Sequence, residues 1–142
     1  MTGVEIDFVV PDCIAALALY ERIFEVEHRN ATALEKGSNE ATFAMYGSLF
    51  HILDENPDYM LFAPKEGQPQ SMWLNVTVSD ITACYAKAIA AGCMEIQPVT
   101  LIEAMGLSNA LFKDPFGYVW MLHQIHREVS FEDRVKIMTS EK

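Results

Sequence analysis

The chain has 142 residues, of which 51% are hydrophobic, and its 20 acidic and 10 basic residues give a formal net charge of −10 at pH 7. This length and hydrophobic content are typical of one globular domain and exclude a disordered chain. The acidic balance argues against nucleic acids and anionic membrane surfaces as partners, because both attract basic proteins. The excess of acidic residues favours ligands that are neutral or cationic.

The sequence favours a cytoplasmic location. It shows no secretory signal at its start and no apolar run near the roughly 20 residues of a membrane span. Its three cysteines, Cys13, Cys84 and Cys93, are odd in number and lack CxxC spacing, which favours reduced thiols. Cys13 and Cys84 lie in helical patterns and are interpreted as small buried fillers. The alternative, a reactive thiol, would need a cationic neighbour.

Two stretches of the chain share one pattern, 68 positions apart. Residues 5–12 and 73–80 each alternate like a strand, end in an aspartate and lead into an apolar helical run. Asp12 and Asp80 are predicted N-caps, since a short carboxylate accepts from the first free N–H groups of a helix. The pattern therefore predicts a strand, a cap and a helix at the start of each half.

Three further strand-like runs follow each predicted helix, so each half has the order βαβββ. The breaks between these runs fall at glycine-containing turns. Residue Ser130 is predicted to begin a short C-terminal helix that turns Phe131, Val135 and Met138 inward. The predicted helices are 13–24 and 81–91, and the predicted strands are 31–35, 41–46 and 49–53 in the first half and 94–102, 107–113 and 118–123 in the second.

The repeated pattern, together with two motifs, resembles the vicinal oxygen chelate superfamily, which includes glyoxalase I, bleomycin-resistance proteins, fosfomycin-resistance enzymes and extradiol dioxygenases. The first motif is Val9-Val10-Pro11-Asp12 with Leu19-Tyr20 and Ile23-Phe24 after it. The second is Lys113-Asp114-Pro115-Phe116-Gly117-Tyr118-Val119-Trp120, which is similar to the PhnB-like branch.

This resemblance implies an α+β fold in which two βαβββ modules form a curved, half-open barrel with the helices on its outer face. It implies one glyoxalase/bleomycin-resistance-like domain over residues 1–125, with modules at about 4–55 and 72–125 and a linker at about 56–71. Residues 126–142 are then a C-terminal tail. A homodimer is also expected, as is common in the family.

The resemblance further implies where metal ligands would lie. In metal-dependent members they occupy two positions on the opening strands and two on the closing strands, which correspond here to Glu5, Trp73, His51 and Met121. Tryptophan has no lone-pair ligand and a thioether suits soft copper, so only Glu5 and His51 can hold a hard or borderline divalent ion. The set is incomplete, because a catalytic site usually has about three protein ligands. Asp7 and His123 are the alternative third ligands.

One face of the predicted sheets gathers aromatic, thioether, imidazole and carboxylate side chains, whereas the other is apolar. This mixture indicates a ligand pocket more than a solvated surface. Glu5 could equally be a strand-end carboxylate, and His51 a hydrogen-bonded strand histidine. The predicted ligand cavity comprises Glu5, Asp7, His51, Trp73, Asn75, Met121 and His123.

The leading hypothesis is a PhnB-like glyoxalase/bleomycin-resistance-type protein that binds a small molecule and lacks a complete glyoxalase-type metal triad. Glu5 and Asp7 could attract a cationic ligand, on which Trp73 could stack. No cofactor is required by this hypothesis. The alternative is a divalent-metal-dependent lyase, isomerase or dioxygenase that uses Glu5 and His51. A third possibility is a protein that associates with a partner chain through residues 131–138.

Overall fold

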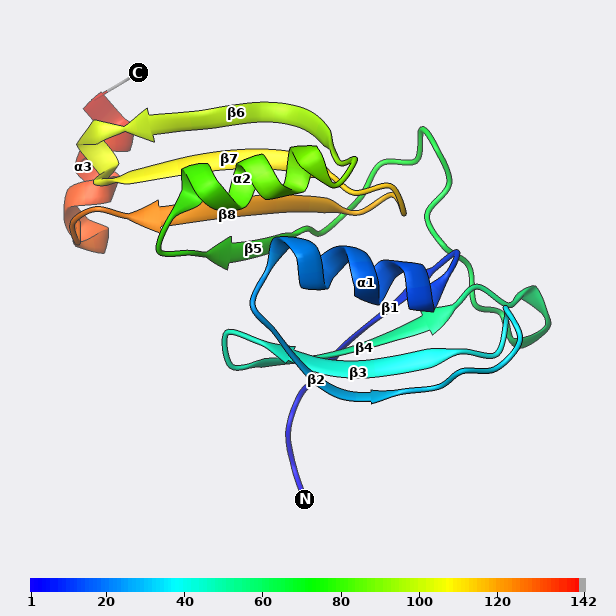
Figure 1. The fold of residues 1–142 in the computed structure, drawn as a ribbon. Helices are drawn as coiled ribbons and strands as arrows, with labels where there is room; N and C mark the ends of the chain where they lie inside the picture. Colours follow the sequence, from blue (N-terminus) through cyan, green and yellow to red (C-terminus); the bar gives the residue numbers. More distant parts are fainter. Residues whose placement is uncertain (141–142) are drawn as a thin grey trace. The chain divides into compact units, whose positions relative to one another are not determined.

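The computed structural model describes residues 1–140 and contains two modules of βαβββ order (Figure 1). It confirms the predicted α+β class with two modules. The first module has β1 (Ile6–Val10), α1 (Cys13–Ile23), β2 (Val26–Ala31), β3 (Glu40–Met45) and β4 (Ser48–Asp54). The second has β5 (Leu74–Thr77), α2 (Ile81–Ala90), β6 (Met94–Ile102), β7 (Leu107–Lys113) and β8 (Val119–Ile125), followed by α3 (Phe131–Ser140).

The chain divides into two compact units. One unit comprises Met1–Pro69 and Pro115–Tyr118, and the other comprises Gln70–Asp114 and the described residues from Val119 onward. Each unit contains one four-stranded sheet and the helix that packs on it. The grouping of both modules into one domain over residues 1–125 stays a prediction. Residues 141 and 142 of the predicted tail lie outside the described residues.

The first sheet has the order β1-β4-β3-β2, with β1 parallel to β4 and the other pairs antiparallel. Helix α1 packs against one face, where Tyr20, Phe43 and Ile52 are fully buried. The rings of Phe43 and Phe50 stack there at 5.4 Å between centroids. Burial of these large apolar side chains removes their surface from water and stabilises this unit.

Two aspartates hold the N-terminus of α1. The predicted cap is confirmed, because the Asp12 carboxylate accepts from the backbone N–H of Ala15 at 3.1 Å. The buried carboxylate of Asp54, at the end of β4, accepts from the N–H of Cys13 at 2.6 Å. It also accepts from the N–H groups of Gly37 and Asn39, each at 2.8 Å. Asp54 therefore ties α1 and the β2–β3 loop to the sheet.

The second sheet has the order β5-β8-β7-β6 and carries α2 on one face. Asp80 caps α2 as predicted, accepting from the N–H of Ala83 at 3.1 Å. Trp120 is fully buried, and its Nε1 donates to the Asp114 carboxylate at 2.9 Å. Pro98 lies in the edge strand β6, where the pairing register is irregular and a missing N–H costs least.

The strand predicted over residues 31–35 is wrong, because β2 covers Val26–Ala31 instead. Every residue of β2 after Val26 is exposed, so this edge strand lacks the alternation by which strands are recognised. The segment that follows is a loop organised by Asn39, whose side-chain oxygen accepts from the N–H of Leu34 at 2.7 Å and from the Thr32 hydroxyl at 2.8 Å.

The C-terminal helix is present, but its predicted orientation is wrong. Ser130 Oγ accepts from the N–H of Asp133 at 3.1 Å, as an N-cap does. Phe131, Val135 and Met138 are nevertheless 78%, 37% and 48% exposed, so they do not turn inward. Among residues 1–140 no helix combines the length and the apolar character that crossing a membrane requires.

Candidate functional site

The candidate site lies on the face of the first sheet that points away from α1. Strand β4 runs between β1 and β3, and its register places Asp7 beside His51 on one side and Thr42 beside it on the other. The neighbours of His51 in β4, Phe50 and Ile52, are buried against the helix-covered face. Because side chains alternate along a strand, His51 and Asp7 point to the opposite face.

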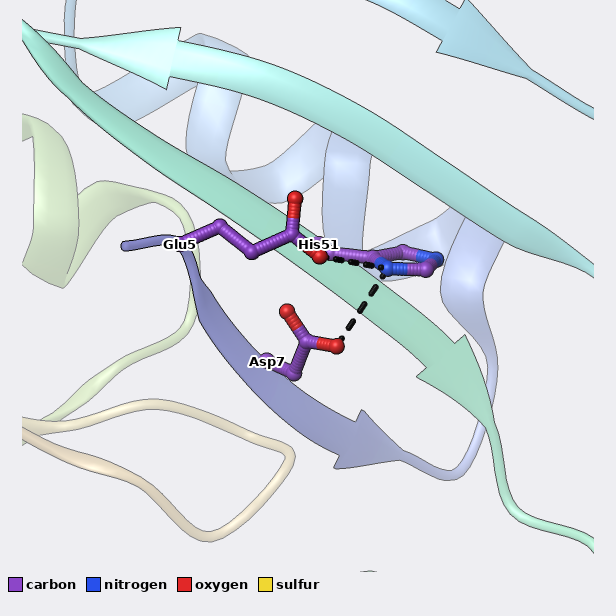
Figure 2. Close-up of side chains that lie close together, drawn as sticks. All are labelled: Glu5, Asp7 and His51. Atoms are coloured by element: carbon purple, nitrogen blue, oxygen red, sulfur yellow. Dashed lines mark hydrogen bonds and ion pairs between the residues drawn. The ribbon is translucent and has the colours of Figure 1, made fainter. Parts of the chain in front are cut away.

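Figure 2 shows two carboxylates directed at one ring nitrogen of His51. Its Nδ1 lies 3.2 Å from Oε1 of Glu5 and 3.4 Å from Oδ2 of Asp7. The possible ligand atoms of these three residues all lie within 4.8 Å of one another. The carboxylate side chains are about half exposed, whereas the imidazole is only 19% exposed. The site is therefore open to solvent above a nearly buried ring.

A third carboxylate approaches the other side of the ring. Oε1 of Glu40, at the start of β3, lies 3.6 Å from Nε2 of His51. This nitrogen is buried and has no hydrogen-bond partner among the described residues. Glu40 was not predicted from the sequence, although the hairpin turn at Tyr46-Gly47 contained the signal. Its two-residue loop sets the β3–β4 register, which puts residue 40 on the face of residue 51.

The Glu5 and Asp7 carboxylates of the site repel each other when both are ionised. Partial burial raises the pKa of Asp7 above its usual value, and the neighbouring Glu5 carboxylate raises it further. His51 acts in the opposite direction, because a positive imidazole would favour ionised Asp7. A cation bound between these groups would relieve the repulsion.

No protein-family model matches the sequence, and no curated protein does. Solved structures do match over nearly the whole chain. The fosfomycin resistance protein FosX from Listeria monocytogenes, solved with Mn(II) and 1S,2S-dihydroxypropylphosphonic acid, aligns with a TM-score of 0.67, 18% identity and coverage of 97% of this chain and 98% of that one. TioX from Micromonospora sp. ML1 aligns with a TM-score of 0.65 and 20% identity, and the alignment covers 88% of this chain and 100% of that one. A glyoxylase/bleomycin resistance protein/dioxygenase domain from Frankia sp. EAN1pec aligns with a TM-score of 0.66 and 15% identity. The alignment covers 92% of this chain and 96% of that one.

The chain has the vicinal oxygen chelate fold. Glu5, Asp7 and His51 all belong to the first module of this fold. Of the two alternative third ligands, Asp7 joins the group, whereas His123 is not part of it. No further group of three or more metal-ligating side chains occurs in residues 1–140.

The donor set suits a hard or borderline divalent ion. Two carboxylates and one imidazole are ligands of Mn²⁺, Fe²⁺ and Zn²⁺, and three protein ligands leave positions open for a substrate. Ligand atoms that share an ion with bonds of about 2.1 Å lie about 3–4 Å apart. The observed spacing of up to 4.8 Å therefore requires only small side-chain rotations. The residues present fit a metal centre in this vicinal oxygen chelate fold.

The other predicted cavity residues lie in the second module. Asn75 pairs with Met121 in register, and Thr77 pairs with His123, all on the face away from α2. Trp73, just before β5, is 54% exposed. Burial and the nearby Arg134 lower the pKa of His123. Both effects favour the neutral form of this imidazole.

Proposed function

We propose that this protein binds an oxygen-bearing small molecule through a divalent metal ion held by Glu5, Asp7 and His51. The observation that supports the proposal most strongly is the convergence of three ligand atoms within 4.8 Å on an open sheet face. The fold supports it as well, since FosX of Listeria monocytogenes was solved with Mn(II). Glu5 and His51 are only two ligands, and Asp7 supplies the third.

In this proposal each residue of the site has a separate task. Glu5 and Asp7 supply negative charge and oxygen ligands, and His51 supplies a neutral nitrogen ligand through Nδ1. A bound ion would supply Lewis acidity, polarising an oxygen of the ligand. The protein is then a metal-dependent lyase, isomerase or dioxygenase of the vicinal oxygen chelate type, or a binding protein of the PhnB-like branch. We further propose a cytoplasmic homodimer in which Trp73, Asn75, Met121 and His123 contact the ligand.

A metal titration tests the proposal. Protein purified without an affinity tag and stripped with a chelator is titrated calorimetrically with Mn²⁺. We expect one site, with affinity reduced at least about 100-fold in His51→Ala, because one of three ligands is lost. His28→Ala is the matched control, since His28 is an exposed histidine of β2 in the same unit. Absence of Mn²⁺ binding in the wild type, or equal affinity in His51→Ala, would overturn the metal site.

A second candidate function is metal-free binding of a cationic compound. It is favoured by the three carboxylates around His51, which come from Glu5, Asp7 and Glu40. Metal-free bleomycin, a cationic glycopeptide, is a suitable probe in the presence of a chelator. Binding is read from the tryptophan fluorescence of the protein. Trp73 is the half-exposed reporter, whereas Trp120 is buried. Quenching that disappears in a Glu5→Gln, Asp7→Asn double variant would support this function, and unchanged quenching in that variant would exclude it.

A further inference from the structure

We infer that Glu40 is a positioning residue for His51, directing the lone pair of its Nδ1 toward Glu5 and Asp7. This inference rests on the proposed metal site and deepens it. A neutral imidazole carries a proton on one nitrogen and a lone pair on the other. Which nitrogen can bind a metal is therefore decided by the partner of the opposite nitrogen.

The carboxylates around His51 favour opposite tautomers. Glu5 and Asp7 lie 3.2 Å and 3.4 Å from Nδ1, and both would accept a proton held there. A proton on Nδ1 would block the only ring nitrogen that faces both candidate oxygen ligands. Glu40 lies on the other side of the ring, 3.6 Å from Nε2. A proton on Nε2 directed at Glu40 leaves Nδ1 free.

The surroundings of Nε2 make Glu40 the relevant partner. Nε2 is buried and has no hydrogen-bond partner among the described residues, so an N–H at this atom needs an acceptor. The Glu40 side chain is 55% exposed, which leaves it room to rotate from 3.6 Å to a charge-assisted hydrogen bond of about 2.8 Å.

The fold holds Glu40 in this place through the hairpin of β3 and β4. Glu40 pairs with Leu53 and Thr42 pairs with His51, so the four residues share one face of the sheet. The N–H of Glu40 donates to the Thr32 hydroxyl at 2.9 Å, which fixes its backbone. The carboxylate thus reaches the ring diagonally from the neighbouring strand, a distance that a glutamate spans.

The test compares three variants by two measurements. Glu40→Ala removes the acceptor, Glu40→Gln retains an acceptor oxygen without the charge, and Glu27→Ala removes one exposed carboxylate of the same unit on β2. The first measurement is Mn²⁺ affinity by calorimetry. The second is the tautomer of His51 in metal-free protein, read from long-range ¹H–¹⁵N correlations in mildly alkaline buffer.

We expect Glu40→Ala to weaken Mn²⁺ binding about 10–100-fold, as loss of a partner to a metal-binding histidine does, with less than a twofold change in Glu27→Ala. Glu40→Gln should recover part of the affinity. Loss of Glu40 should shift the tautomer of His51 from the form with the proton on Nε2 toward the form in which Nδ1 donates to Glu5. An identical tautomer in both proteins would overturn the inference, as would equal losses in Glu40→Ala and Glu27→Ala. If the wild type binds no Mn²⁺, the metal site fails, and the tautomer still decides the role of Glu40.

Discussion

Nδ1 of His51 lies 3.2 Å from Oε1 of Glu5, although the two residues are 46 positions apart in the chain. The parallel pairing of β1 with β4 brings them together, because it places the first residues of β1 beside Phe50 and His51. Asp7 follows two positions after Glu5 and therefore reaches the same side of the ring. β1 and the residue just before it thus supply both carboxylates, and the adjacent strand β4 supplies the imidazole.

The raised pKa of Asp7 predicts that this residue costs stability when it is ionised. Since its pKa is higher in the folded than in the unfolded chain, its stabilising contribution is present below the usual carboxyl pKa and is lost as the pH rises through the folded value. Asp7→Asn should therefore raise the melting temperature slightly at pH 7 and leave it unchanged near pH 3. Differential scanning calorimetry at both pH values measures this.

Added Mn²⁺ should reverse the order of the melting temperatures of the wild type and Asp7→Asn at pH 7, since the ion stabilises only the protein that binds it. The wild type should gain melting temperature with added Mn²⁺, and Asp7→Asn should gain little. An Asp7→Asn protein that melts below the wild type at pH 7 without metal would contradict the repulsion inferred for this site.

Asp54 is predicted to stabilise the first unit through its three backbone hydrogen bonds. Asp54→Ala leaves the N–H groups of Cys13, Gly37 and Asn39 without this acceptor, so we expect a loss of about 3 kcal/mol in the free energy of unfolding. Urea denaturation provides the value. Asp58→Ala, at an exposed aspartate, is the control and should change stability by less than about 0.5 kcal/mol. Equal effects would show that the Asp54 contacts contribute nothing.

The three cysteines should be unreactive in the folded protein. Burial is the main cause that raises the pKa of the Cys13 and Cys93 thiols to about 12 and that of Cys84 to about 11. Very little reactive thiolate is therefore present at pH 8. Ellman's reagent should label three thiols in denaturant and none rapidly in native protein. Because these pKa values are raised by folding, stability should fall as the pH rises above about 9. Fast labelling of Cys13 or Cys84 in native protein would refute their assignment as buried fillers.

Two phenylalanines provide a test of the corrected tail orientation. Phe112 is fully buried under α2, whereas Phe131 of α3 is 78% exposed. Phe112→Ala should cost about 3–5 kcal/mol, and Phe131→Ala should cost less than about 0.5 kcal/mol. Chemical denaturation of both variants compares them. A large loss in Phe131→Ala would restore the inward orientation that the sequence pattern predicted.

The predictable parts of the fold are those whose residues carry a local signal. Asp12 and Asp80 each precede an apolar helical run, and both helices begin after them. Strand β2 carries no such signal, because its backbone pairs with β3 while its side chains are exposed. The outward face of α3 could not be predicted either, because an apolar stripe on a helix indicates a buried face only if another element covers it.

The candidate site was predictable to the extent that alternation along strands determines it. Period two placed Glu5, Asp7 and His51 on one face, and the structure brings their ligand atoms together. The distances among them depend on the β1–β4 register, which no short turn sets. The roles of Glu40 and Asp54 depend on pairing and loop contacts that form only in the folded chain. No periodicity of the sequence reports these contacts.

Crystals soaked with Mn²⁺ test whether Glu5, Asp7 and His51 together hold one divalent ion. We expect a single anomalous-scattering peak about 2.1–2.2 Å from Nδ1 of His51 and from one carboxylate oxygen each of Glu5 and Asp7. A saturating soak that gives no peak beside His51, or a peak that contacts neither carboxylate, would contradict it.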